Sequence, residues 1–271
     1  MPAPRLPVIR PLLAGLRDVI DTLVPPFVTL GIEEARADGR AWRPDPPVAY
    51  CPRCGATIAE QGVTPAGCAF CVDQSLPWHR LVRLGAYEPP LDGWILRMKF
   101  AGQWSWARWF GELLANHVPT PATTTTNNAT SPNPKSKSRD TQFPIVCPVP
   151  MAPLRRCRRG YNQARLMADA LARARGWPVA PLLHRRGGRP PQASLDAATR
   201  RTNLAGVMRL DPVDLTDTHV ILVDDVKATG ATLAACARLL AKAGASSITA
   251  AVAATGDPSR QRFHQIKPRR P

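Results

Sequence analysis

Four of the seven cysteines stand in two close pairs whose spacing is typical of a metal site. Cys51 and Cys54 form one C-x2-C pair, and Cys68 and Cys71 form a second pair after thirteen intervening residues. Each pair can present two thiolates from one tight turn, and four soft sulfur ligands in a tetrahedron suit Zn²⁺. A closed set of four thiolates leaves no open coordination position. The spacing therefore predicts a structural zinc ribbon, with a redox pair or a disulfide as the alternative interpretation.

A second group of polar residues directly follows an apolar strand nearer the carboxyl end of the chain. The run 220–223 reads Val-Ile-Leu-Val, and Asp224 and Asp225 come next. After Val226 the chain continues into a turn that precedes a predicted helix over 231–243. The residues of this turn are Lys227, Ala228, Thr229, Gly230, Ala231 and Thr232.

The composition of the turn predicts that it binds phosphate. Gly230 lets the backbone approach a ligand closely, because glycine has no side chain to keep the ligand away. The first turn of the following helix directs free N–H groups and its positive dipole end at an anion. Thr229 and Thr232 add hydroxyl donors.

The two adjacent carboxylates indicate what carries that phosphate. Asp224 and Asp225 repel an anion, but they can accept hydrogen bonds from the vicinal hydroxyls of a sugar. A phosphate beside a ribose predicts a sugar phosphate ligand. The alternative interpretation is structural, because an Asp-Asp pair before a helix is common as an N-cap.

The charge of the chain favours polyanionic partners, either nucleotides, nucleic acid or anionic lipid. Lys and Arg number 36 against 20 Asp and Glu, which gives a formal net charge of +16. The excess is concentrated, since 151–211 holds 13 Arg and 3 acidic residues, and 260–271 adds five basic residues. Two such segments in an otherwise near-neutral chain favour a binding surface over a merely solvated face.

No secretion or membrane signal stands out in the sequence. No run approaches the ~20 apolar residues that span a bilayer, and charged residues interrupt the apolar N-terminal segment. We therefore expect neither a signal peptide nor a membrane span. Paired cysteines in a metal pattern are typical of a reducing compartment, so we expect a cytoplasmic protein.

Beyond residue 143 strands and helices alternate in the predicted pattern. Such alternation predicts an α/β fold, with a parallel sheet flanked by helices and ligands beyond the carboxyl ends of the strands. The expected strands are 81–87, 143–149, 178–183, 219–224 and 247–254, and the expected helices are 11–23, 91–100, 104–118, 161–175 and 231–243. The low-complexity segment 119–142 is expected to be a disordered insertion.

Several motifs together make the chain resemble the ComF (competence protein F) family. The segment 220–232 is similar to the phosphoribosyl diphosphate (PRPP) signature of type I phosphoribosyltransferases. The paired cysteines, Lys99-Phe100-Ala-Gly, Val149-Pro150, Arg159-Gly160-Tyr161-Asn162-Gln163 and the pattern Gln192-x2-Leu195-x4-Arg200-x2-Asn203 match the ComF family. The resemblance covers roughly 12–255, and the joint order of the motifs is far more specific than any one of them.

The resemblance implies a phosphoribosyltransferase-like fold and a role for each motif. Asp224 and Asp225 would hold the ribose hydroxyls, and 227–232 would hold the 5′-phosphate. Arg159, Gln192 and Arg200 are candidates for the diphosphate or for a loop over the site. Mg²⁺ would screen the diphosphate charge.

The implied domains are an N-terminal helix and connector, a zinc ribbon, a phosphoribosyltransferase-like domain and a basic tail. Their expected ranges are 1–47, 48–76, 77–256 and 257–271. Three features depart from the family pattern. Ala228 replaces the usual Thr, Tyr161 replaces the commoner Phe, and 26–31 stands where many relatives have an extra cysteine pair, which leaves a second zinc site open.

The function that the resemblance implies is a PRPP-binding accessory protein of natural competence, which handles incoming single-stranded DNA with a DNA-uptake or helicase partner. One alternative is an active phosphoribosyltransferase of nucleotide salvage or sugar-phosphate metabolism. Another is a nucleic-acid module with a vestigial nucleotide fold. No segment of the sequence has residues that indicate a pocket for a phosphoribosyl acceptor.

Overall fold

The computed structural model describes residues 42–256, except for 59–61, 65–66, 121–142 and 187–205. The described residues from 43 to 256 belong to one compact unit. The expected helix over 11–23, the expected basic tail and most of the expected insertion lie outside the described residues. In the described part of the chain, no helix combines the length and the apolar character that a membrane crossing requires.

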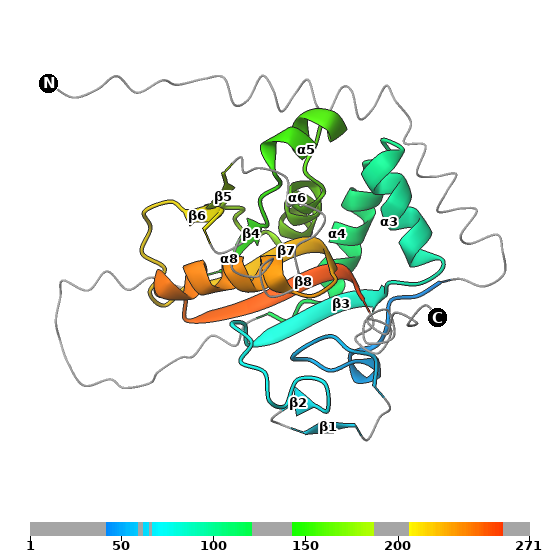
Figure 1. Ribbon diagram of the computed structural model, residues 1–271, viewed down its shortest axis with the longest axis horizontal. Helices are drawn as coiled ribbons and strands as arrows, with labels where there is room; N and C mark the ends of the chain where they lie inside the picture. Colours follow the sequence, from blue (N-terminus) through cyan, green and yellow to red (C-terminus); the bar gives the residue numbers. More distant parts are fainter. Residues whose placement is uncertain (1–41, 59–61, 65–66, 121–142, 187–205, 257–271) are drawn as a thin grey trace, which may run out of the picture. The chain divides into compact units, whose positions relative to one another are not determined.

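A four-stranded parallel sheet forms the centre of the fold, in the order β3-β8-β7-β4 (Figure 1). Its strands are β3 (Arg80–Ala86), β4 (Ile145–Pro148), β7 (His219–Lys227) and β8 (Ser247–Thr255). Every pairing within it is parallel. The predicted α/β class with a parallel sheet is confirmed.

The expected strand over 178–183 is reduced to a single parallel bridge between Val179 and Val146. Pro178 and Pro181 flank this bridge, and proline has no N–H to donate to a ladder. The chain instead forms β5 (Leu183–Arg185), which pairs antiparallel with β6 (Met208–Leu210).

Helices cover both faces of the sheet (Figure 1). One face packs against α8 (Ala231–Lys242), and the other packs against α4 (Ser105–His117) and α6 (Gln163–Arg175). The other helices of the described residues are α3 (Leu91–Phe100), α5 (Pro153–Arg159) and the 3₁₀ helix η1 (Pro47–Ala49). The cysteine-rich segment adds the short pair β1 (Val63–Thr64) and β2 (Gly67–Cys68).

Alternation along β7 brings its side chains to both faces of the sheet. Val220 and Leu222 join the apolar cluster that includes Leu233 and Cys236 of α8. The neighbouring Ile221 is fully buried too. Because successive strand residues point to opposite faces, the two aspartates that end this run also diverge.

Candidate functional site

The four paired cysteines come together as one buried cluster, and their sulfur atoms lie within 4.8 Å of one another. The Sγ–Sγ distances are 3.7 Å for Cys51–Cys71, 3.5 Å for Cys54–Cys68 and 3.9 Å for Cys68–Cys71. A tetrahedron with metal–sulfur bonds of about 2.3 Å has sulfurs about 3.8 Å apart. All four thiols are free of disulfides. The geometry therefore fits a tetrahedral Zn²⁺ ion and excludes the disulfide interpretation.

The backbone around the cluster prepares one of its sulfurs for a metal. Burial raises the pKa of the Cys51 thiol, but hydrogen bonds from the backbone N–H groups of Cys54, Arg53 and Cys68 outweigh it and lower this pKa to about 7. Burial raises the pKa of Cys54. Because a metal ligand must be a thiolate, the N–H groups around Cys51 favour metal binding.

Arg83 joins the cysteine module to the carboxyl end of the sheet. Its side chain is 1% exposed. The guanidinium donates to the Gly55 carbonyl oxygen at 2.7 Å and to Thr255 Oγ1 at 2.7 Å, and it pairs with Asp45 at 2.6 Å. One buried cation therefore connects the cysteine module with β3 and β8.

Asp224 and Asp225 lie side by side near the carboxyl end of β7 and serve different partners. The Asp225 carboxylate forms an ion pair with Lys99 of α3 at 3.0 Å. Asp224 Oδ1 accepts a hydrogen bond from the backbone N–H of Asp225 at 2.9 Å.

Neither aspartate caps α8. Gly230 is the N-cap of this helix, and the N-cap residue makes no side-chain hydrogen bond. The interpretation of the aspartates as an N-cap is therefore wrong.

The surroundings of the partly buried Asp224 favour the protonated form of its carboxyl group. Burial raises the pKa of its carboxyl group, and the charge of Asp225 raises it further. The backbone N–H of Asp225 and the cations Lys99 and Arg185 oppose this shift without cancelling it. A ligand that needs the Asp224 carboxylate must therefore displace this proton.

This raised pKa predicts how stability depends on pH. Asp224 holds its proton more tightly in the folded chain than in the unfolded chain, so stability falls as pH rises from the ordinary carboxyl range through the raised pKa. In the variant Asp224→Asn the side chain cannot ionise, so this fall in stability does not occur. We expect the variant to gain stability relative to the wild type between about pH 5 and about pH 9, as measured by urea unfolding. A constant difference across that range would contradict the assignment.

The predicted phosphate loop, residues 227–232, joins β7 to α8. Gly230 has a φ of +79°, a left-handed conformation that favours glycine. The Thr229 hydroxyl accepts from the backbone N–H of Ala231 at 3.4 Å, while Lys227 is only 8% exposed. The loop thus places small residues and the first N–H groups of α8 beside the two aspartates.

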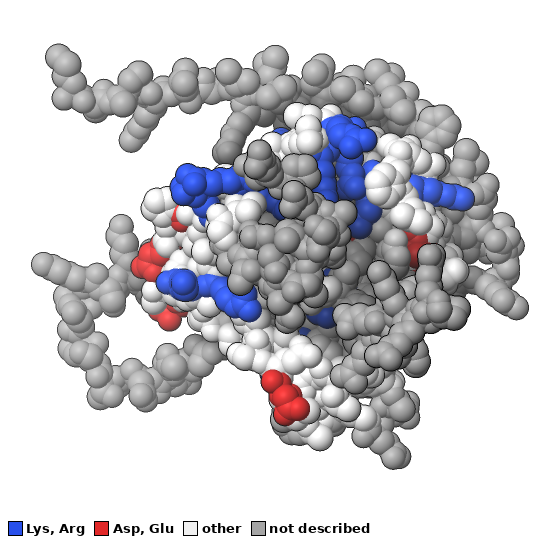
Figure 2. Space-filling model, viewed as in Figure 1, with Lys and Arg blue, Asp and Glu red and all other residues white. Residues whose placement is uncertain are grey.

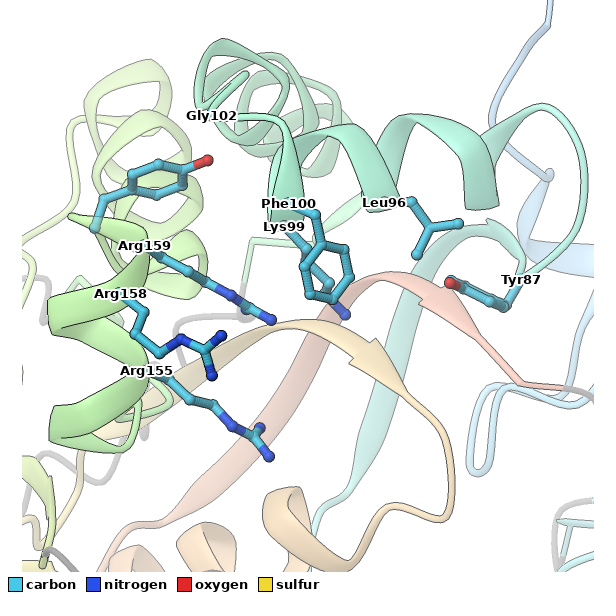
Figure 3. A pocket seen from close by; sticks show the side chains of 9 residues that line it. Tyr87, Leu96, Lys99, Phe100, Gly102, Arg155, Arg158 and Arg159 are labelled. Atoms are coloured by element: carbon cyan, nitrogen blue, oxygen red, sulfur yellow. The ribbon is translucent and has the colours of Figure 1, made fainter.

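A cavity of about 750 Å³ opens near the same end of the sheet, between α3 and α5. Figure 3 shows Arg155, Arg158 and Arg159 extending from α5 toward Lys99 and Phe100 of α3. Tyr87, Leu96, Gly102 and Tyr161 complete the lining. Lys and Arg gather at the α5 end of the molecule in Figure 2. The cavity is therefore strongly cationic and has an aromatic and aliphatic wall.

Local contacts hold the two walls of this cavity together. The Arg159 guanidinium lies over the Phe100 ring, 4.9 Å from its centroid. The Tyr161 hydroxyl donates to the backbone carbonyl of Met98. Gly160, at a φ of +77°, ends α5 between these two residues. The hydroxyl that distinguishes Tyr161 from the usual Phe thus bonds to α3.

Some of the predicted site residues lie together in the structure, and others fall outside the described residues. Asp224, Asp225 and 227–232 lie together, and Arg159 lies on the cavity wall. Gln192 and Arg200 fall outside the described residues. Sequence reasoning missed Lys99 as a site residue, although the motif Lys99-Phe100-Ala-Gly contained it. The density of arginine in 151–211 was the available signal for Arg155 and Arg158.

A second cavity, of about 490 Å³, lies on the side of the phosphate loop that faces the cysteine module. It is bounded by α8, the phosphate loop and the connector that follows the last cysteine pair. The lining residues are Gln74, Ser75, Leu76, Pro77, Trp78, Lys227, Thr229, Gly230, Ala231, Ala234 and Arg238. None of them lines the first cavity.

The chain is similar to one protein family and to several individual proteins. The phosphoribosyl transferase domain family matches residues 164–270. DNA utilization protein YhgH of Salmonella typhimurium is 30% identical over 204 residues, which cover 74% of this chain and 82% of that protein. YhgH of Escherichia coli K12 is 31% identical, covering 73% of this chain and 80% of the relative. Competence protein F of Haemophilus influenzae is 31% identical, covering 73% and 81%.

The fold and these matches define a phosphoribosyltransferase-like protein that carries a cluster of four cysteines. Within that class, the chain belongs to the ComF family.

Proposed function

We propose that this protein binds PRPP, or a closely related sugar phosphate, as an accessory protein of DNA uptake that handles incoming single-stranded DNA in the cytoplasm. The observation that carries the proposal is the juxtaposition at the end of β7. Two aspartates, one of them paired with Lys99, stand beside a glycine-capped phosphate loop. The names of the relatives, DNA utilization protein and competence protein F, support the cellular role.

The site suggests a place for each part of the ligand. The carboxylates of Asp224 and Asp225 would accept hydrogen bonds from the ribose hydroxyls. The N–H groups and hydroxyls of 227–232 would bind the 5′-phosphate, since an anion there meets the positive end of α8. Arg159 would contact the diphosphate, with Gln192 and Arg200 as further candidates, and Mg²⁺ bound to the ligand would screen its charge.

Zn²⁺ in the cysteine cluster would supply stability and no chemistry, because four thiolates close its coordination. Cys51, Cys54, Cys68 and Cys71 would hold the ion. The residues near the ribose would orient the ligand, and the arginines of α5 would hold its anionic end.

The cationic cavity supports the part of the proposal that concerns DNA. Arginine guanidiniums bind phosphates, and exposed rings stack on unpaired bases. Phe100 is 73% exposed beside Arg159. A single strand would therefore find phosphate partners on α5 and a stacking surface on α3. Proteins of the uptake machinery, a helicase among them, would be the partners that deliver this strand.

This surface predicts a salt-dependent affinity for single-stranded DNA. Replacing Arg155, Arg158 and Arg159 together with Gln is expected to weaken binding about tenfold or more and to flatten the salt dependence. The measurement is fluorescence anisotropy with a labelled oligonucleotide over a range of salt concentrations. Arg108→Gln, which alters the exposed Arg108–Glu112 pair on α4, is the control. Binding that is insensitive to salt, or equal in all variants, would contradict this surface.

An active phosphoribosyltransferase is the second candidate function. The observation that favours it is the 750 Å³ cavity, which is roomy enough for an acceptor and bordered by Lys99, the partner of Asp225. A transferase would stabilise an oxocarbenium-like state while diphosphate leaves.

Release of diphosphate separates the two candidate functions. PRPP and Mg²⁺ are mixed with the zinc-loaded protein and a panel of nucleobases, and diphosphate is measured. The accessory role predicts that PRPP binds without base-dependent turnover. Turnover with one base would make the protein an enzyme. A protein that binds no PRPP, and whose aspartates can be replaced without effect on DNA uptake, would instead fit a nucleic-acid module with a vestigial nucleotide fold.

A further inference from the structure

The turn 51–55 carries the first cysteine pair. Its carbonyl groups accept hydrogen bonds from Trp78 and Leu81, at the start of β3. The Pro52 carbonyl accepts from the backbone N–H of Leu81 at 2.7 Å. The Arg53 carbonyl accepts from Trp78 Nε1 at 2.7 Å. Because Pro52 and Arg53 lie between Cys51 and Cys54, a metal held by these cysteines also fixes where the two carbonyls point.

The indole of Trp78 reaches from this turn to the phosphate loop. A Cβ placed on Gly230 would lie 3.5 Å from Trp78 Cη2 and 3.2 Å from Lys227 Cε. Trp78 is 5% exposed, so its ring is fixed by its surroundings. One side chain therefore bonds to the cysteine turn through its N–H, and its ring lies beside the loop in the second cavity.

Lys227 is a second connection between the two sites. It is 8% exposed, and its ammonium has no hydrogen-bond or ion-pair partner among the residues that the structure describes. It lines the second cavity together with Trp78 and the connector that follows the last cysteine pair. The stem of the same residue lies beside Gly230, because a Cβ built on that glycine would be 3.2 Å from Lys227 Cε.

We propose that Trp78 and Lys227 are positioning residues that couple the cysteine cluster to the phosphate loop, so that Zn²⁺ and the sugar phosphate bind with positive cooperativity. Zinc holds the turn 51–55, the turn holds the indole, and the indole and the lysine stem hold the loop in its binding conformation. The proposal rests on the proposed function, because it requires a phosphate ligand at the loop. Coupling of this kind is reciprocal, so each ligand tightens the other by the same factor.

The test is the affinity of the full-length protein for zinc, measured by competition with a chromophoric chelator at equilibrium. It is measured with Mg²⁺ alone and with Mg²⁺ and saturating PRPP. We expect PRPP to tighten zinc binding by about fivefold or more. Any zinc that PRPP itself binds acts in the opposite direction, so an observed tightening comes from the protein. Calorimetry on the same samples records whether PRPP binds.

Trp78→Phe isolates the connection, because it removes the N–H donor and keeps a ring. The expected effect of PRPP on zinc affinity then falls below about twofold. Trp177→Phe is the matched control, since Trp177 is similarly buried at 7% exposed and contacts Arg175 instead of the loop. Lys227→Met, which keeps the stem under Gly230 and removes the charge, serves as a second variant and is expected to lose the coupling too.

The outcomes separate this proposal from the proposed function. If calorimetry shows bound PRPP but zinc affinity does not change in the wild type, the coupling is wrong and the proposed function stands. Full coupling in both Trp78→Phe and Lys227→Met would also overturn it. If PRPP does not bind at all, the proposed function fails and the coupling fails with it.

Discussion

Cys54→Ser is expected to abolish tight zinc binding and to lower the melting temperature by about 10 °C or more. Zinc held by four thiolates contributes folding free energy directly, of about 10 kcal/mol or more in isolated zinc-binding peptides. Cys54 is 6% exposed and lies 3.5 Å from Cys68, sulfur to sulfur. A serine hydroxyl at this place is a poor zinc ligand and leaves three thiols without their metal.

The loss should extend beyond the cysteine module. Gly55 follows Cys54 directly, and its carbonyl accepts from the buried Arg83. Releasing the turn therefore takes one acceptor away from a buried guanidinium that also bonds to Thr255 at the end of β8. A buried donor that loses its partner is costly, so the end of the sheet should loosen as well.

Zinc content and thermal unfolding check this prediction together. The control is Cys157→Ser, the same substitution at an exposed cysteine of α5. We expect the control to keep one zinc per chain and the melting temperature of the wild type. Equal zinc content in Cys54→Ser and in the control would contradict the four-cysteine site.

Replacing both aspartates with asparagine is expected to weaken PRPP binding about 100-fold or more. Each carboxylate would accept a charge-assisted hydrogen bond from a ribose hydroxyl, worth about 1.5–3 kcal/mol. Asparagine keeps the shape of the side chain but presents only one weaker acceptor oxygen. The variant Asp224→Asn/Asp225→Asn also releases Lys99 from its ion pair at 3.0 Å.

The measurement is a calorimetric titration of Mg²⁺ and PRPP into the zinc-loaded protein. Asp169→Asn is the matched control, because Asp169 pairs with Arg165 at 2.8 Å on α6 and lines neither cavity. The control should bind as the wild type does. Affinities within about threefold for the double variant and the wild type would show that the aspartates do not hold the ligand.

The pH dependence of PRPP binding should follow Asp224. The folded protein raises the pKa of this carboxyl group by burial and by the neighbouring Asp225. A ligand that binds the carboxylate form therefore binds more tightly as pH rises toward that raised pKa, with release of a proton.

Much of this arrangement was predictable from local sequence patterns. The spacing of Cys51, Cys54, Cys68 and Cys71 predicted a metal cluster, because the two ends of each pair must share one turn. An apolar run followed by two aspartates and a glycine turn predicted β7 and the start of α8 after Gly230. In both cases the relevant residues are close neighbours in the sequence, so tertiary structure adds little to their geometry.

Other parts depended on tertiary structure. The helix α5 has only seven residues and four arginines, so it shows no apolar periodicity. The pairing of Lys99 with Asp225 joins residues more than 100 positions apart, and no local pattern reports it. The N-cap interpretation failed because β7 continues through Lys227, which leaves the aspartates inside the strand. The sequence patterns therefore located the loop but not the cation that pairs with Asp225.

The most direct measurement is a crystal structure of the zinc-loaded protein with Mg²⁺ and PRPP bound. Our account predicts the ribose hydroxyls at the carboxylates of Asp224 and Asp225 and the 5′-phosphate at the N–H groups of 228–232. The diphosphate should face the arginines of α5. A ligand held by those arginines alone, with the loop and both aspartates untouched, would contradict the account.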